Sequence, residues 1–377
     1  MKDTGLYIHI PFCKMKCYYC DFPSFSGKES LMVDYARALS LEINQACSGK
    51  RIKSIFIGGG TPTYLSLEGW EIIAEALRKI EINKEDFEFT IEGNPKTFKK
   101  EQLAFFKAMG VNRISMGLQA AQSCHLESLG RIHTYKDFEE SFNMVREAGI
   151  ENINVDLMFG LPGQTIDEWK ETLRKVREKN PQHISCYSLI IEEGTKFYNL
   201  YEADKLILPS EEQERKMYSE ALSYLKDNGY EHYEISNFAK PGHRCRHNLI
   251  YWNMEAYIGC GSSAHSYVDG KRYSNEVSVE KYISMMNAGD SSVKEYHVNS
   301  EADEMEEFIF LGLRKMEGIS INEFSSRFKK DIYEVYSQVI EKHKKLGLLQ
   351  VDGDRMFLTE RGIELSNQVM SDFILTA

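Results

Sequence analysis

The chain has 377 residues, of which 42% are hydrophobic and 27% are charged, and its formal net charge is −11 at pH 7. This composition is typical of a globular protein and excludes disordered and fibrous classes. The negative charge argues against a protein that coats nucleic acid with a basic surface, so we expect no nucleic-acid partner.

The eight cysteines are unevenly distributed along the chain. Cys13, Cys17 and Cys20 lie within eight residues, whereas the other five are scattered. We find no apolar run of the length of a signal peptide or a transmembrane segment, which predicts a cytoplasmic protein. In that compartment, clustered cysteines bind metals or act in catalysis more often than they form disulfides.

Short strand patterns alternate with amphipathic helices through the first half of the chain. The predicted strands are 6–10, 54–57, 88–91, 113–116, 153–157 and 183–187. The predicted helices between them are 31–46, 67–80, 100–109, 135–148 and 166–179. This alternation predicts parallel strands joined by right-handed crossovers, in either a doubly wound sheet or an open barrel.

The pattern changes in the second half. A polar insertion at 192–209 precedes a predicted helix at 211–227 and a strand at 230–235. A segment rich in Gly, His and Cys follows at 241–266, and residues 287–300 have the polar composition of a linker.

The C-terminal part has the pattern of a winged helix. The predicted helices are 301–317, 321–328 and 332–346, and the predicted hairpin strands are 348–351 and 356–359. A winged helix often binds DNA, but from residue 301 onward fifteen acidic residues face ten basic ones. Because phosphate binding requires positive charge, we do not expect this module to bind DNA.

The three clustered cysteines follow the first predicted strand in the pattern Cys13-x3-Cys17-x2-Cys20. Three thiolates on a short loop can hold a soft metal or an iron–sulfur cluster. A [4Fe–4S] cluster held by only three cysteines has one open iron, which can chelate a methionine-like ligand. A closed zinc site would need a fourth ligand, for which His9 is the nearest candidate.

This spacing resembles the signature of the radical S-adenosylmethionine (SAM) superfamily, and the resemblance extends over the first half of the chain. It implies an α/β fold, a partial (β/α)6 TIM-like barrel with its site at the C-terminal ends of the strands. We predict a core barrel with the cluster loop at 1–230, an extension at 231–295, and a C-terminal helical, winged-helix-like domain at 296–377.

Polar motifs follow successive predicted strands, as a barrel of this type requires. The resemblance implies that the glycine-rich segment 58–62 binds the SAM amino group, that Glu92 binds the ribose and that Tyr19 lies near the adenine. The implied SAM-binding residues are Tyr19, Gly59, Gly60, Thr61, Glu92, Gln119, Arg131 and Asp156, and the implied cluster ligands are Cys13, Cys17 and Cys20.

Segments 7–13, 58–63 and 129–134 are similar to the branch that contains oxygen-independent coproporphyrinogen III dehydrogenase (HemN), which oxidatively decarboxylates two propionates of a porphyrinogen. The HemN cluster motif has a further cysteine two positions after the third, where this chain has Phe22. HemN also has a long extension before the first strand, whereas here the first predicted strand begins at residue 6. Both differences match the sister family of HemW heme chaperones, which this chain resembles over essentially its whole length.

Residues 247–252, HNLIYW, form an HNxxYW motif that the HemW family associates with heme. Imidazole is a common axial ligand of heme iron, and the resemblance implies that His247 contacts heme. On composition alone, His247 could instead be a histidine whose hydrogen bonds are satisfied within the fold. His265 could line the mouth of the site or bond locally.

The resemblance therefore implies a chaperone that binds a [4Fe–4S] cluster, SAM and heme. Its expected partners are an electron donor for the cluster and the heme-accepting proteins to which it delivers heme. HemN is the alternative, so the sequence leaves open whether the chain is an enzyme. It also leaves open whether the chain forms a homodimer.

Overall fold

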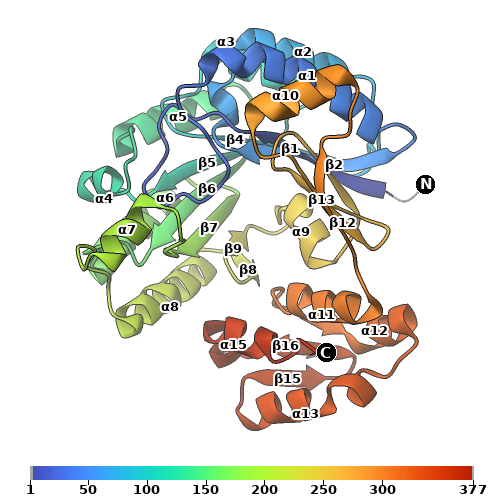
Figure 1. The fold of residues 1–377 in the computed structure, drawn as a ribbon. Coiled ribbons are helices and arrows are strands. Elements are labelled where there is room, and N and C mark those ends of the chain that lie inside the picture. Colours follow the sequence, from blue (N-terminus) through green and yellow to red (C-terminus); the bar gives the residue numbers. More distant parts are fainter. Residues whose placement is uncertain (1–2, 376–377) are drawn as a thin grey trace.

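The computed structural model describes residues 3–375, and its first half is a curved parallel sheet with helices on the outer face (Figure 1). Six strands lie side by side in chain order: β1 (Asp3–Ile10), β2 (Arg51–Gly59), β4 (Glu88–Gly93), β5 (Arg113–Gln119), β6 (Asn152–Phe159) and β7 (His183–Ser188). The helices that connect them are α1 (Met32–Ala46), α2 (Leu67–Leu77), α3 (Lys100–Met109), α5 (Tyr135–Glu147) and α6 (Ile166–Glu178). Shorter elements are η1 (Glu29–Leu31), η2 (Pro62–Tyr64), β3 (Glu81–Ile82) and α4 (Ser123–Ser128). The predicted parallel α/β fold is confirmed.

The strands are hydrophobic almost throughout because both faces of a parallel sheet are covered. All seven residues of β5 are buried, and Leu6 and Ile8 of β1 are completely buried. In the outer layer, Trp70 of α2 packs edge-on against Phe106 of α3, with ring centroids 4.7 Å apart. The C-terminal ends of the strands therefore meet along one rim of a well-packed sheet, where several loops can build one site.

The sheet continues beyond both edges of the parallel series. Next to β7, β9 (Asn237–Ala239) and β8 (Glu231–Glu234) pair antiparallel. Next to β1, β10 (Tyr257–Cys260) pairs parallel, and β11 (His265–Val268), β12 (Lys271–Asn275) and β13 (Val293–Val298) follow antiparallel. The helices of this part are α7 (Lys196–Glu202), α8 (Glu211–Asp227), α9 (Arg246–Trp252) and α10 (Val279–Ala288).

Two segments that the sequence indicates as irregular contain regular structure. The prediction that residues 287–300 form a linker is wrong, because Val293–Val298 form β13 and pair with β12. All six side chains of β13 are exposed, so the segment lacks the alternating hydrophobicity by which a strand is recognised. The polar insertion at 192–209 contains α7, which begins after Thr195 as its N-cap.

A buried carboxylate joins the segment after β9 to the outer helices. Glu42 of α1 accepts hydrogen bonds from the Gly261 amide, the Asn275 side chain and the hydroxyls of Tyr282 and Ser292, at 2.5 to 2.7 Å. Burial raises the pKa of Glu42. The boundaries at 230 and 295 stay predictions, and the strands on both sides of residue 230 belong to one sheet.

The C-terminal part has its own hydrophobic core and a small three-stranded sheet. Its elements are α11 (Glu301–Gly312), β14 (Ile319–Ser320), α12 (Ile321–Phe328), α13 (Ile332–Lys345), β15 (Leu349–Asp352), β16 (Arg355–Leu358), α14 (Glu360–Glu364) and α15 (Ser366–Ser371). Met254 and Tyr267, which precede this part in the chain, belong to the same core. Within residues 3–375, no helix combines the length and hydrophobicity needed to cross a membrane.

Candidate functional site

The three clustered cysteines lie on one loop after β1. The base of the loop is closed by two backbone hydrogen bonds, from the Cys13 amide to the Phe25 carbonyl at 2.9 Å and from the Phe25 amide to the Pro11 carbonyl at 2.7 Å. Cys13 is buried, and Cys17 and Cys20 are half-buried. The three thiols are therefore held on a closed loop rather than spread through the core.

Helix α7 supports this loop from the side. The Tyr18 amide donates to the Leu129 carbonyl at 3.0 Å, and the Phe197 amide donates to the Tyr18 carbonyl at 2.9 Å. Lys196 Nζ lies 3.4 Å from the centroid of the Tyr18 ring, and the Tyr19 ring packs beside that of Phe197. The sequence prediction missed this support because Leu129 and Phe197 are remote in sequence from the cysteines.

The chemistry of the loop fits a metal cluster bound by three thiolates. Burial raises the pKa of Cys20 to about 11, with a further contribution from Cys17, so a bare thiol here keeps its proton. Arg131 Nη1 donates to Cys17 Sγ at 3.4 Å and places a cation beside the thiols. A metal that replaces the protons would remove the cost of these buried thiolates. Nδ1 and Nε2 of His9 pair with Tyr7 and Pro23, so His9 is not free to complete a zinc site.

The glycine-rich segment after β2 packs against the same loop. The Gly60 amide donates to the Ile10 carbonyl and the Thr61 amide to the Phe12 carbonyl, both at 2.8 Å. A Cβ at Gly60 would lie 2.8 Å from the Phe12 carbonyl oxygen and 3.0 Å from Cys13 Sγ. Gly59 has φ of +112°, which an L residue rarely adopts. These glycines are therefore required for the close approach of two loops.

Three of the predicted SAM-binding side chains, Thr61, Gln119 and Arg131, lie near one another at the rim of the sheet. Thr61 Oγ1 lies 3.5 Å from Cys13 Sγ. Arg131 Nη2 donates to the Gly117 carbonyl at 2.5 Å, and a Cβ at Gly117 would touch both Arg131 and Gln119. Arg131 Nε is buried without a hydrogen-bond partner among residues 3–375, and such a donor suits an anionic ligand.

Asn94 belongs to this group and was missed as a site residue. Its Nδ2 donates to Thr61 Oγ1 at 2.8 Å, and its Oδ1 would lie 2.9 Å from a Cβ at Gly117. The sequence carries a signal for it, because Asn94 stands two positions after Glu92 at the end of the same strand.

Glu92 and Asp156 line a polar cavity of 310 Å³ inside the half-barrel. Glu92 Oε2 accepts a hydrogen bond from the Gly59 amide at 3.2 Å, and Asp156 accepts from Asn154 at 2.8 Å and Ser115 at 3.2 Å. Burial, reinforced by the nearby Asp156, raises the pKa of Glu92 to about 8, so near neutral pH this carboxyl can both donate and accept hydrogen bonds.

Further polar side chains of this cavity escaped the sequence prediction. They are Arg113, Ser115, Asn154, Ser185 and Tyr187. On β5, β6 and β7 they occupy every second position of otherwise hydrophobic strands, at 113 and 115, 154 and 156, and 185 and 187. This alternation within a buried parallel sheet is the signal that one face of each strand lines a polar space.

The HNxxYW motif forms α9. His247 is fully buried, its Nδ1 pairs with Ser54 Oγ and its Nε2 with the Tyr251 hydroxyl, both at 2.8 Å. Its backbone amide donates to Glu88 Oε1 at 3.1 Å. Burial lowers the pKa of His247 to about 3, so the ring is neutral. His247 thus lines the polar cavity, with both ring nitrogens already paired.

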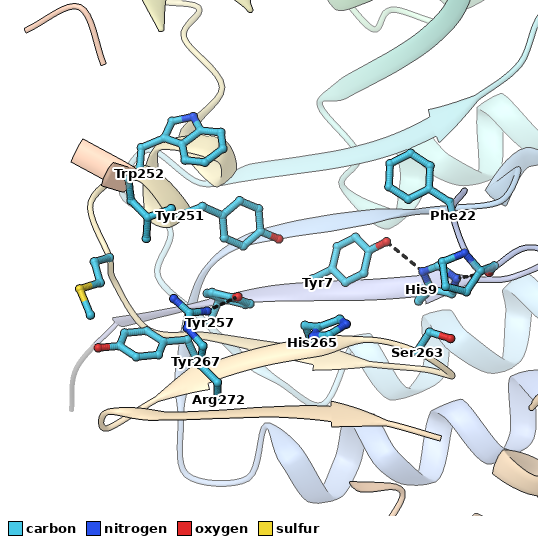
Figure 2. A pocket seen from close by; sticks show the side chains of 13 residues that line it. Tyr7, His9, Phe22, Tyr251, Trp252, Tyr257, Ser263, His265, Tyr267 and Arg272 are labelled. Atoms are coloured by element: carbon cyan, nitrogen blue, oxygen red, sulfur yellow. Dashed lines mark hydrogen bonds between the residues drawn. The ribbon is translucent and has the colours of Figure 1, made fainter. Parts of the chain in front are cut away.

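A second cavity of 480 Å³, whose lining side chains are drawn in Figure 2, shares residues with the first. Tyr7, Phe22 and Tyr251 line both cavities and form the wall between them. Most of the other residues around the second cavity come from the segment that runs from α9 through β12, and Leu311 comes from α11. The site therefore consists of a cluster loop, a polar cavity and an adjoining aromatic cavity.

We expect Glu92→Gln to stabilise the cofactor-free protein at pH 8. The folded-state pKa of Glu92 lies above its ordinary value of 4.5, so the unfolded chain loses this proton first as the pH rises. The free energy of unfolding therefore falls between about pH 4.5 and pH 8 in the wild type, and glutamine removes this fall. Melting temperatures by calorimetry should show a gain for the variant at pH 8 that disappears by pH 4.

Glu193→Gln is the matched control, because Glu193 is exposed in a turn outside any helix. It should melt as the wild type does at both pH values. A Glu92→Gln gain that is the same at pH 4 and pH 8 would contradict the raised pKa.

Comparisons with known proteins extend over the whole chain. Residues 7–176 match the family model of the radical SAM superfamily, and residues 299–365 match that of the HemN C-terminal domain. The chain is 39% identical to the protein of Bacillus subtilis (strain 168) named heme chaperone HemW, over 98% of each chain. It is 36% identical to the protein of that name from Lactococcus lactis subsp. lactis, over 99% of this chain and 98% of the relative. The solved structure of coproporphyrinogen III oxidase (HemN) from Escherichia coli superimposes with a TM-score of 0.86 at 23% identity, covering 99% of this chain and 90% of that one, which shows a shared fold.

Proposed function

The chain belongs to the radical SAM superfamily and, within it, to the family of proteins named heme chaperone HemW; from this premise we propose that it binds one [4Fe–4S] cluster, SAM and heme, and delivers heme to acceptor proteins. The proposal includes a cytoplasmic location and an electron donor that reduces the cluster.

Cys13, Cys17 and Cys20 would hold the cluster, whose open iron can chelate SAM and pass one electron to it. Arg131 places its positive charge beside Cys17, and its Nε, which has no hydrogen-bond partner within residues 3–375, is available to an anionic group of the ligand. Glu92, protonated near neutral pH, can donate to one ribose hydroxyl and accept from the other.

The observation that carries the heme proposal is the presence of two cavities that share one wall. The polar cavity, next to the glycine-rich segment, has the hydrogen-bonding groups that suit SAM. The aromatic cavity of 480 Å³ is a separate space within the size range of small-molecule sites. The protein can therefore hold a flat apolar ligand in addition to SAM.

The expected contact between His247 and heme stays a prediction. A direct bond from His247 to iron would have to replace its hydrogen bond to Ser54 or the one to Tyr251.

We expect the reconstituted protein to bind heme and to leave coproporphyrinogen III unchanged. The physical reason is Phe22, which occupies the position of the fourth HemN cysteine and is 62% exposed in the wall of both cavities. Anaerobic incubation with SAM, a reductant and the porphyrinogen, followed by chromatography, tests the reaction. A heme titration of the same sample, followed by the Soret difference spectrum, tests binding.

Protoporphyrinogen formed over several turnovers would identify the chain as a dehydrogenase. Absence of heme binding would remove the chaperone proposal. HemN assayed in parallel controls for the activity of the reagents.

A further inference from the structure

His265 is the first residue of β11, and it lines the aromatic cavity, where Figure 2 shows it beside Tyr7. Its side chain is exposed. Within the described residues 3–375, neither of its ring nitrogens has a hydrogen-bond partner. The ring therefore presents an available lone pair to the cavity.

Two other histidines line the cavities, and both are committed elsewhere. His9 pairs with Tyr7 at 3.0 Å and with the Pro23 carbonyl at 2.8 Å. His247 pairs with Ser54 and Tyr251 at 2.8 Å each. A buried imidazole that exchanged such a bond for a metal would leave its former partner unpaired, at a cost of about 1 to 3 kcal/mol. Only His265, among the histidines lining the two cavities, can coordinate iron without this cost.

The surroundings of His265 suit a porphyrin. Aromatic side chains line the space on several sides, among them Phe22, Trp252, Tyr257 and Tyr267. Such rings pack against a flat π-system by stacking or edge contacts. Arg272 also belongs to the wall, where its guanidinium pairs with both carboxylate oxygens of Glu307 and donates to the Tyr257 hydroxyl, so its charge is already balanced within the protein.

We propose that heme binds in this aromatic cavity with His265 as an axial ligand of the iron, and that His247 is a positioning residue that orients Tyr251. The inference rests on the proposed function and specifies where its cargo is held. One coordination bond forms, from an imidazole nitrogen lone pair to iron, and no electron or proton has to be transferred.

The test is a heme titration of the cluster-loaded protein and of its His265→Ala and His247→Ala variants, monitored by Soret difference and resonance Raman spectra. His265→Ala should lose the histidine–iron signature and weaken binding by about tenfold or more. Added imidazole should restore the signature in His265→Ala, because it can occupy the space that the side chain leaves. His247→Ala should keep the signature with weaker binding, because Tyr251 loses the partner that orients it while the His265 ring is left in place. His243→Ala is the matched control, since His243 is half-buried and lines neither cavity.

The outcomes separate this inference from the proposed function. If the wild type binds heme and His265→Ala gives the same spectrum, His265 is not the ligand and the heme proposal stands. If His247→Ala loses the signature and imidazole restores it there, His247 is the ligand. If the wild type binds no heme, the proposed function fails first. A melting temperature and an iron content close to those of the wild type in each variant show that the fold is intact.

Discussion

Cys17→Ala is expected to remove the iron–sulfur cluster. Wild-type protein reconstituted without oxygen should be brown and contain about four irons per chain, and the variant less than about one. Cys17 is the thiol that receives the Arg131 hydrogen bond, and the two remaining thiols would leave two irons without a protein ligand. Iron and sulfide analysis together with the visible absorption spectrum measure the change.

Cys124→Ala provides the control, because Cys124 is an exposed cysteine on α4. It should keep the iron content of the wild type. A Cys17→Ala variant with full iron content would refute the assignment of this ligand. Colourless wild type with one tightly bound zinc would refute the cluster itself.

Gly60→Ala is expected to lower both cluster occupancy and SAM affinity although it removes no ligand. The new methyl group would lie 2.8 Å from the Phe12 carbonyl oxygen and 3.0 Å from Cys13 Sγ, so one of the two loops must move. Overpacking of this kind costs about 1 to 3 kcal/mol, and we expect at least a tenfold loss of SAM affinity. Calorimetric titration of SAM and iron analysis provide the two readouts.

Gly69→Ala is the matched control. Gly69 lies in α2, and the three atoms nearest to its added methyl group would all belong to the side chain of Leu65, at 3.1 to 3.3 Å, which is flexible enough to adjust. The variant should keep its iron and its SAM affinity. A Gly60→Ala variant that binds SAM as well as the wild type does would show that the two loops tolerate separation.

The parallel α/β series was predictable because its signals are local. Each strand is a short hydrophobic run, and each helix has its own apolar stripe, so neither depends on distant partners. The cluster cysteines were equally local, since all three lie on one loop. The strand β13 was not predicted, because all of its side chains are exposed and its pairing with β12 leaves no local hydrophobic pattern in the sequence.

The state of His247 could not be predicted from its motif. Its hydrogen bond to Ser54, the stacking of its ring on Phe56 and the bond from its amide to Glu88 come from strands far earlier in the chain. The motif predicts a histidine near the site, whereas these long-range contacts determine whether its ring is free. Conversely, the available ring of His265 depends on the absence of such contacts among the described residues.

The shared wall of Tyr7, Phe22 and Tyr251 has a thermodynamic consequence. A ligand that moves this wall while filling one cavity changes the free energy of filling the other. Such coupling is reciprocal, so whatever factor SAM imposes on the affinity for heme, heme imposes on the affinity for SAM. If SAM raises the affinity for heme, its departure favours release of the cargo, and Tyr7, Phe22 and Tyr251, which line both cavities, transmit the effect.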